Sequence, residues 1–111
     1  MRSIIQEEKD SQCFLCAMLD NDYSTRTGLE KHHIYGGPNR TLSEREGLYV
    51  YLCHQHHNEP PDGVHYNRRN MNYLHEIGQE AWVYRQQKIK GCTRREAIGA
   101  FMKIFGINFL D

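Results

Sequence analysis

The sequence predicts a small α+β domain, with short strands in the first part of the chain and two helices in the last. Two observations support this class. Short runs of β-branched and aromatic residues lie before residue 60, and hydrophobic residues recur at helical spacing from Met71 onward. A chain of 111 residues has the length of one domain, so we expect a single domain over residues 1–111.

The expected strands lie at residues 3–6 (SIIQ), 31–37 (KHHIYGG) and 47–53 (GLYVYLC). The second strand is expected to end at its two glycines, because a proline follows them. Residues 20–30 are polar and rich in turn formers, which predicts a loop. Residues 58–63 (NEPPDG) are also expected to form a loop, because the two prolines lack backbone N–H donors.

Two helices are expected after this loop. The hydrophobic residues from Met71 onward follow the helical period, and Gly91 is the expected end of that helix. Thr93 and Glu96 have the spacing of a capping box, which predicts the start of a second helix there. Gly106 is the expected C-terminal cap of this second helix.

The charges of the chain balance, with fourteen basic and fourteen acidic residues. Residues 1–60 carry six Lys or Arg against nine Asp or Glu, whereas residues 61–111 carry eight against five. No overall positive field therefore draws the protein to nucleic acid, and any such contact must come from a local patch.

The first ten residues have no apolar stretch of signal-peptide length, and no segment approaches the length of a membrane span. We therefore expect a cytoplasmic protein without a membrane partner. Thiols stay reduced in the cytoplasm, where clustered cysteines bind metal more often than they form disulfides.

Two pairs of metal-ligating residues share one spacing. Cys13 and Cys16 form the first pair, and Cys53 and His56 repeat the spacing after the third expected strand. Four such ligands in two pairs match structural zinc sites, although His57 could replace His56. A redox role for CFLC is disfavoured, because no βαβ pattern surrounds it. We expect this zinc-binding part over about 1–75 and the C-terminal helices over about 67–111.

The motifs CFLC, KHHIYGGPNR, GLYVYLCHQHHN and GVHYN, in this order, resemble the HNH endonucleases of the ββα-metal group. The resemblance is strongest to small phage-encoded HNH-like proteins, and the motifs span residues 13 to about 67. It implies a small zinc-stabilised ββα-metal core with a C-terminal two-helix extension.

The resemblance also implies roles for the histidines that the zinc pairs do not use. His33 matches the general base that deprotonates the attacking water. His32 and His57 match ligands of a catalytic divalent metal, which could be Mg²⁺, Mn²⁺, Ni²⁺ or Zn²⁺. In the HNH pattern, a further metal ligand or contact normally follows one helical turn after the position of His57. This chain has PPDG there, and His65 is the best candidate to replace that ligand.

The middle asparagine of the HNH pattern is missing from its usual place before the returning strand, where this chain has Glu46-Gly47-Leu48. Asn39, Asn58 and Asn67 are the candidates to replace it, and Asn39 ranks first because its loop follows the His-His strand. His75, beside the apolar face of the long helix, is expected to be structural.

The expected function is therefore a metal-dependent endonuclease that hydrolyses phosphodiester bonds, with DNA as the expected partner. Histidine has an ordinary pKa of about 6.5, which suits a base near neutral pH. Arg68 and Arg69 flank the expected site and are candidates for phosphate contacts. The first alternative is a non-catalytic zinc module that binds nucleic acid or protein; a redox or metal-homeostasis protein is the second.

Overall fold

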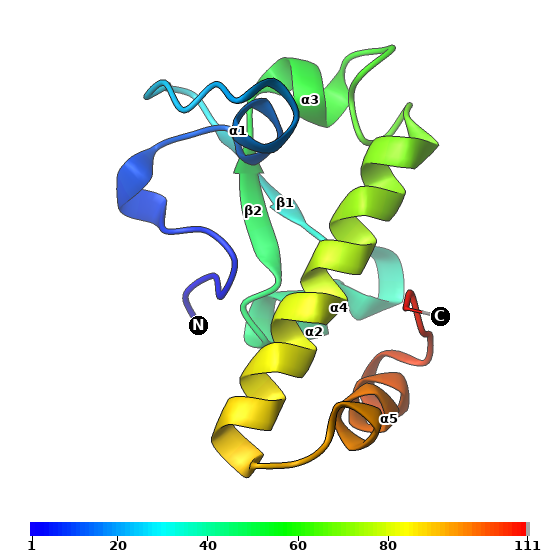
Figure 1. Cartoon of the computed structure of the whole chain (residues 1–111). Helices are drawn as coiled ribbons and strands as arrows, with labels where there is room; N and C mark the ends of the chain where they lie inside the picture. The colour runs from blue at the N-terminus through cyan, green and yellow to red at the C-terminus, as the bar shows by residue number, and fades with distance from the viewer. Residues whose placement is uncertain (111) are drawn as a thin grey trace.

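The computed structural model describes residues 1–110 and contains two antiparallel strands, three short helices and two longer ones in that part of the chain (Figure 1). The mixed helix-and-strand class expected from the sequence is confirmed. The elements, in chain order, are η1 (Glu8–Asp10), α1 (Phe14–Asp20), β1 (Glu30–His33), η2 (Gly37–Asn39), α2 (Arg40–Arg45), β2 (Tyr49–Leu52), α3 (His54–Asn58), α4 (Arg68–Lys90) and α5 (Arg94–Phe105).

The sheet consists of β1 and β2, paired with Glu30 opposite Leu52 and His33 opposite Tyr49. The predicted strand at residues 3–6 is wrong. This segment runs beside β2 but is held by isolated contacts, such as the backbone bond from Ile4 N to the Gly47 carbonyl (2.9 Å) and the Tyr51 N bond to the Gln6 side chain (2.8 Å). The side chain of Gln6 takes the place of a backbone ladder, so no third strand forms.

Three short helices differ from the expectations. CFLC begins α1, which was not among the helices expected from the sequence, and Cys13 is the N-cap that accepts a bond from Cys16 N. The helices α2 and α3 were not predicted, because each is only one or two turns long and has no hydrophobic repeat of its own. α3 follows Cys53 directly and carries the second group of histidines.

The two longer helices agree with the expectations. α4 begins at the Asn67 cap and ends at Gly91, which adopts the left-handed conformation with a φ of 65°. The capping box of Thr93 and Glu96 is present at the start of α5, and Gly106 caps its end. Both terminal glycines stand where a left-handed residue satisfies the last carbonyls of a helix.

The core lies where α4 crosses the sheet and packs against α5 (Figure 1). Ile34 and Tyr35, directly after β1, meet α4 at Gly78, and Phe101 of α5 is fully buried beside them. The segment after α5 returns to α4, where the buried Gln79 accepts a bond from Phe109 N (2.6 Å). These contacts place β1, β2, α3 and α4 around one region that carries most of the histidines. No helix in residues 1–110 is long and apolar enough to cross a membrane.

Candidate metal centres

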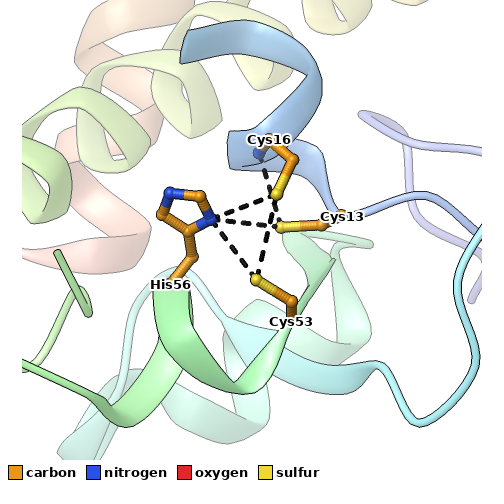
Figure 2. Close-up of side chains that lie close together, drawn as sticks. All are labelled: Cys13, Cys16, Cys53 and His56. Atoms are coloured by element: carbon orange, nitrogen blue, oxygen red, sulfur yellow. Dashed lines mark hydrogen bonds between the residues drawn. The ribbon is translucent and has the colours of Figure 1, made fainter. Parts of the chain in front are cut away.

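The first centre joins the start of α1 to the start of α3 (Figure 2). Cys13 and Cys16 come from the first turn of α1, and Cys53 and His56 come from the end of β2 and from α3. The side chains converge although the two pairs are distant in sequence. We call this group the knuckle. The structure places His56 in the knuckle and His57 elsewhere.

The distances within the knuckle fit a tetrahedral ion. His56 Nδ1 lies 3.6 Å from Cys13 Sγ, 3.4 Å from Cys16 Sγ and 3.4 Å from Cys53 Sγ. The Cys16 and Cys53 sulfurs are 3.9 Å apart. Tetrahedral bonds of ~2.3 Å to sulfur and ~2.05 Å to nitrogen would separate sulfurs by about 3.8 Å and sulfur from nitrogen by about 3.6 Å. The four residues could therefore hold a metal such as zinc.

The electrostatics of the knuckle also suit a cation. Burial, together with the neighbouring Cys13 and Cys53, raises the pKa of the Cys16 thiol to about 12. Neighbouring thiols oppose each other's ionisation unless a positive ion offsets their charge. All four cysteines of the chain, including Cys92 outside the knuckle, are free, so no disulfide ties up the knuckle thiols. CFLC begins a helix, which is also a feature of redox motifs. Its two thiols, however, are grouped with His56 and Cys53, which favours a metal site over a redox pair.

The second centre consists of His32 from β1, His57 from α3 and His65 from the turn before α4. One nitrogen from each ring lies within 4.8 Å of the others. The ring centroids are 5.1 to 5.6 Å apart, and the rings meet edge to face or at a tilt. We call this group the histidine centre. Three imidazoles pointing at one another form a donor set typical of Zn²⁺, Ni²⁺ and other divalent transition ions.

His32 supplies the clearest sign of a ligand site. Its side chain is only 5% exposed, and its Nε2 atom is enclosed without a hydrogen-bond partner in residues 1–110. Burial, with a smaller contribution from His57 and His65, lowers the pKa of His32 to about 3. The ring is therefore neutral near pH 7. A buried polar atom without a partner is costly, and coordination of a metal would remove that cost.

Two carboxylates hold three of the histidines. Glu30 accepts bonds from His57 Nδ1 (2.8 Å) and from His54 Nδ1 (2.8 Å), and these donors hold its pKa at about 2. His57 Nδ1 is thus occupied, which leaves Nε2 for a metal. Glu44 lies 2.7 Å from His33 Nε2 and 2.8 Å from Lys31 Nζ, and these two partners lower its pKa to about 2.

One cavity connects the histidine centre with His33. It has a volume of about 360 Å³ and is lined by His32, His33, Ile34, Gly36, Gly37, Arg40, His57, His65, Met71 and His75. His33 is the last residue of β1, where the strand ends, so it can face the same cavity as its neighbour His32. The expected general base and the three expected metal ligands therefore line a single hollow.

The asparagine candidates all have other partners. Asn39 Nδ2 donates to the Phe105 carbonyl (3.0 Å), and Asn67 caps α4. Asn58 Nδ2 donates to Glu30 (3.0 Å) and lies beside His57. In the part of the chain that the structure describes, no asparagine lines the cavity.

The basic candidates lie in the first turn of α4. Arg68 and Arg69 are both exposed and follow His65 at the edge of the histidine centre, but neither lines the cavity. The lining cation is Arg40, at the start of α2. His75, expected to be structural, packs its ring against Tyr35 and Phe109 and also contributes to the cavity wall.

Sequence reasoning missed Arg40, Glu30 and Glu44. Arg40 follows the Gly-Pro-Asn turn, and a proline before a short polar run was a signal for a helix start there. No sequence pattern marks Glu30 or Glu44 as a site residue, because each reaches its histidine only after β1 and α2 have folded.

No family model matches this chain, and no curated protein or solved structure matches it either.

Proposed function

We propose that this protein is a metal-dependent endonuclease with a zinc-stabilised ββα-metal core like that of the HNH enzymes. The observation that carries the proposal is the shared cavity: His33 lines it together with three histidines, one of which has a buried nitrogen without a partner in residues 1–110. A zinc module that only binds needs the four knuckle residues. The second centre is the feature that such a module does not explain.

The path of the chain supports the ββα-metal assignment. β1 and β2 are antiparallel neighbours, and α3 follows β2 directly. In this arrangement His32 and His33 come from the first strand and His57 from the helix. The knuckle ties α1 to the start of α3 and thereby fixes the position of His57 relative to β1.

His33 is proposed as the general base. In neutral His33, Nε2 carries the proton that Glu44 accepts across 2.7 Å, which leaves Nδ1 with the lone pair that can take a proton from water. Glu44 is in turn held by Lys31. This pair fixes the tautomer and the orientation of the ring, as an oriented base requires.

His32, His57 and His65 are the residues that would hold a divalent ion. Such an ion, when bound, supplies positive charge that stabilises the phosphoryl oxygens and the leaving oxygen. The neutral His32 ring and the carboxylate on His57 Nδ1 both prepare ring nitrogens for coordination.

The proposed substrate is DNA. Arg40 in the cavity wall provides a cation for the phosphate at the site, and Arg68 and Arg69 provide two more along the expected path of the backbone. Since the net charge of the chain is zero, these local cations would have to supply the attraction.

The test is cleavage of supercoiled plasmid by the zinc-loaded protein with Mg²⁺, Mn²⁺ or Ni²⁺, with an EDTA control. Loss of a general base typically slows a reaction about 10²–10⁴-fold, so His33→Ala should cut the plasmid that much more slowly. Added imidazole should partly restore cleavage by His33→Ala, because it replaces the missing base. Wild-type rates in folded His33→Ala would exclude His33 as the base.

A second candidate function is a non-catalytic zinc module that binds nucleic acid or protein. The hydrogen bond from Asn39 to the Phe105 carbonyl favours this module. Asn39 is the first-ranked replacement for the middle asparagine of the HNH pattern, and this bond already uses its side-chain amide. The same plasmid assay separates the two functions. Binding without cleavage under every divalent ion would favour the module.

A further inference from the structure

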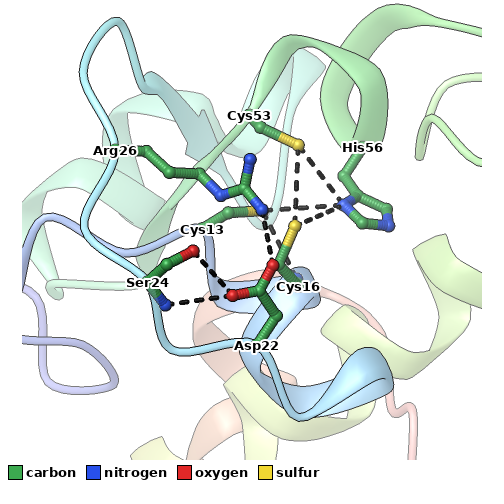
Figure 3. A network of polar contacts seen from close by, with 7 residues as sticks. All are labelled: Cys13, Cys16, Asp22, Ser24, Arg26, Cys53 and His56. Atoms are coloured by element: carbon green, nitrogen blue, oxygen red, sulfur yellow. Dashed lines mark hydrogen bonds and ion pairs between the residues drawn. The ribbon is translucent and has the colours of Figure 1, made fainter.

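The loop between α1 and β1 folds back over the knuckle and carries Arg26 to it (Figure 3). The turn begins at Asn21, which has a φ of 54°, and at Asp22, whose N–H donates to the Cys16 carbonyl (3.0 Å). The Arg26 N–H donates to the Ser11 carbonyl (2.8 Å), just before the first cysteine. The backbone on both sides of the loop is thus tied to the segment that holds the first cysteine pair.

The side chain of Arg26 is clamped in place. Asp22 Oδ2 accepts from Arg26 Nη2 (2.7 Å), while Asp22 Oδ1 accepts from both the N–H and the hydroxyl of Ser24 (3.1 and 2.6 Å). In Figure 3 the guanidinium extends toward the knuckle sulfurs. Asp22 therefore fixes the direction of the cation as well as its position.

One nitrogen of Arg26 is enclosed without a partner. The side chain as a whole is 35% exposed, but Nε is buried and has no hydrogen-bond partner in residues 1–110. The guanidinium thus keeps an N–H group without an oxygen acceptor, and thiolates are able to accept from such groups.

The charge of a filled knuckle explains why a cation belongs there. Three thiolates and one neutral imidazole around a Zn²⁺ ion carry a net charge of about −1. The site is buried, with Cys13 and Cys16 at most 6% exposed, so water screens this charge poorly. Arg26 supplies the opposite charge at the face where the loop closes over the sulfurs.

We propose that Arg26 is the counter-cation of the knuckle: it offsets the excess negative charge of the metal–thiolate group and slows loss of the ion. Arg26 is a positioning residue, since it acts through the cysteines and not on the metal. The inference rests on the zinc proposed for the knuckle and needs no nuclease activity.

The test compares zinc release from the full chain after loading with one equivalent of Zn²⁺. Release to an excess of a coloured chelator is timed for the wild type, Arg26→Met and Arg26→Lys. Outer-shell partners of metal ligands typically contribute 10- to 100-fold to metal affinity, so Arg26→Met should release zinc about tenfold faster or more. Arg26→Lys keeps the charge and should release zinc close to the wild-type rate. Arg94→Met is the matched control, because it removes an exposed arginine–carboxylate pair with Glu80 far from the knuckle.

A second readout follows the sulfurs directly. Zinc-bound thiolates with less positive charge beside them should react faster with iodoacetamide, a neutral alkylating agent, in a Cys92→Ser background. Release and alkylation at wild-type rates in Arg26→Met would overturn the proposal. Equally fast release from Arg26→Lys and Arg26→Met would also overturn it, because the charge would then not matter. If the wild type binds no zinc, the knuckle proposal itself fails first.

Discussion

His56 and His57 are adjacent in the sequence and belong to different centres. Both lie in α3, where each residue turns the side-chain direction by about 100°. His56 Nδ1 therefore meets the knuckle sulfurs, while His57 Nδ1 meets Glu30. The spacing in the sequence predicts that Cys53 and one of the two adjacent histidines are ligands of the same ion. The choice between the two histidines could not be predicted, because α3 itself has no sequence pattern that predicts it.

Glu30 is the residue whose removal should affect the histidine centre most selectively. In Glu30→Gln the bond that holds His57 Nδ1 is weakened, so the ring loses its fixed tautomer. We expect about 10- to 100-fold weaker binding of Ni²⁺ or Co²⁺ to the zinc-loaded protein, measured by calorimetry. Glu59→Gln is the control, since Glu59 contacts His54 at 3.7 Å and not His57. Equal affinities for the two variants would refute the positioning role of Glu30.

At the scale of elements, the approach of α4 to the end of β1 determines where the cavity forms. Gly78 permits this approach, because a Cβ at that position would lie 2.8 Å from the Tyr35 hydroxyl and 3.0 Å from Ile34 Cγ2. Tyr35 has little room to move, since it is 3% exposed and its hydroxyl donates to the His75 carbonyl (2.7 Å). The crossing therefore fixes Ile34 and Tyr35 against the helix, and with them the end of β1 that carries His32 and His33.

Gly78→Ala should therefore destabilise the protein although alanine is the better helix former. Overpacking costs about 1–3 kcal/mol, and the gain in helix propensity offsets up to about 1 kcal/mol of it. Gly99→Ala in α5 is the matched control, because the added Cβ would meet no atom within 4 Å apart from its chain neighbours and the backbone of its own helix. It should stabilise the protein by about 0.5–1 kcal/mol. Urea unfolding of both zinc-loaded variants measures the difference, and a stabilised Gly78→Ala would contradict the close crossing.

Among the helices and strands, the helix ends could be predicted from the sequence, but the pairing of the first segment could not. The capping box of Thr93 and the stops at Gly91 and Gly106 were predictable, because helix ends depend on local side-chain and backbone chemistry. The absence of a strand at residues 3–6 was not predictable. Whether that segment forms a ladder with β2 depends on contacts such as the Gln6 side chain to Tyr51 N, and these join residues far apart in the sequence.

At the scale of the whole molecule, the knuckle joins the first segment of the chain to the sheet and α3. A protein of this size buries a modest core, so one metal centre is expected to contribute a large share of the stability. Cys13→Ser should lose zinc and lower the thermal unfolding midpoint strongly. Cys92→Ser is the control, because Cys92 lies outside both centres. Equal midpoints and equal zinc contents in the two variants would contradict a stabilising metal in the knuckle.

Under the proposed function, DNA would contact the exposed first turn of α4, which carries Arg68 and Arg69. Replacing both Arg68 and Arg69 by Ala should weaken DNA binding and reduce the slope of affinity against salt, because each phosphate contact releases counterions. Fluorescence anisotropy at several salt concentrations measures both quantities. An unchanged affinity and slope would show that the two exposed arginines only contact solvent.

If the proposed function is correct, the two centres bind separate ions and the second ion enables cleavage. The most direct measurement is a titration of Mn²⁺ or Ni²⁺ into protein that already holds one zinc, with plasmid cleavage recorded at each step. Cleavage should begin as the second ion binds, and His57→Ala should need a much higher ion concentration to reach it. His33→Ala should stay slow at every concentration, because its defect is proton transfer. Cleavage that is complete with one zinc, or absent at all ion concentrations in the wild type, would contradict the claim.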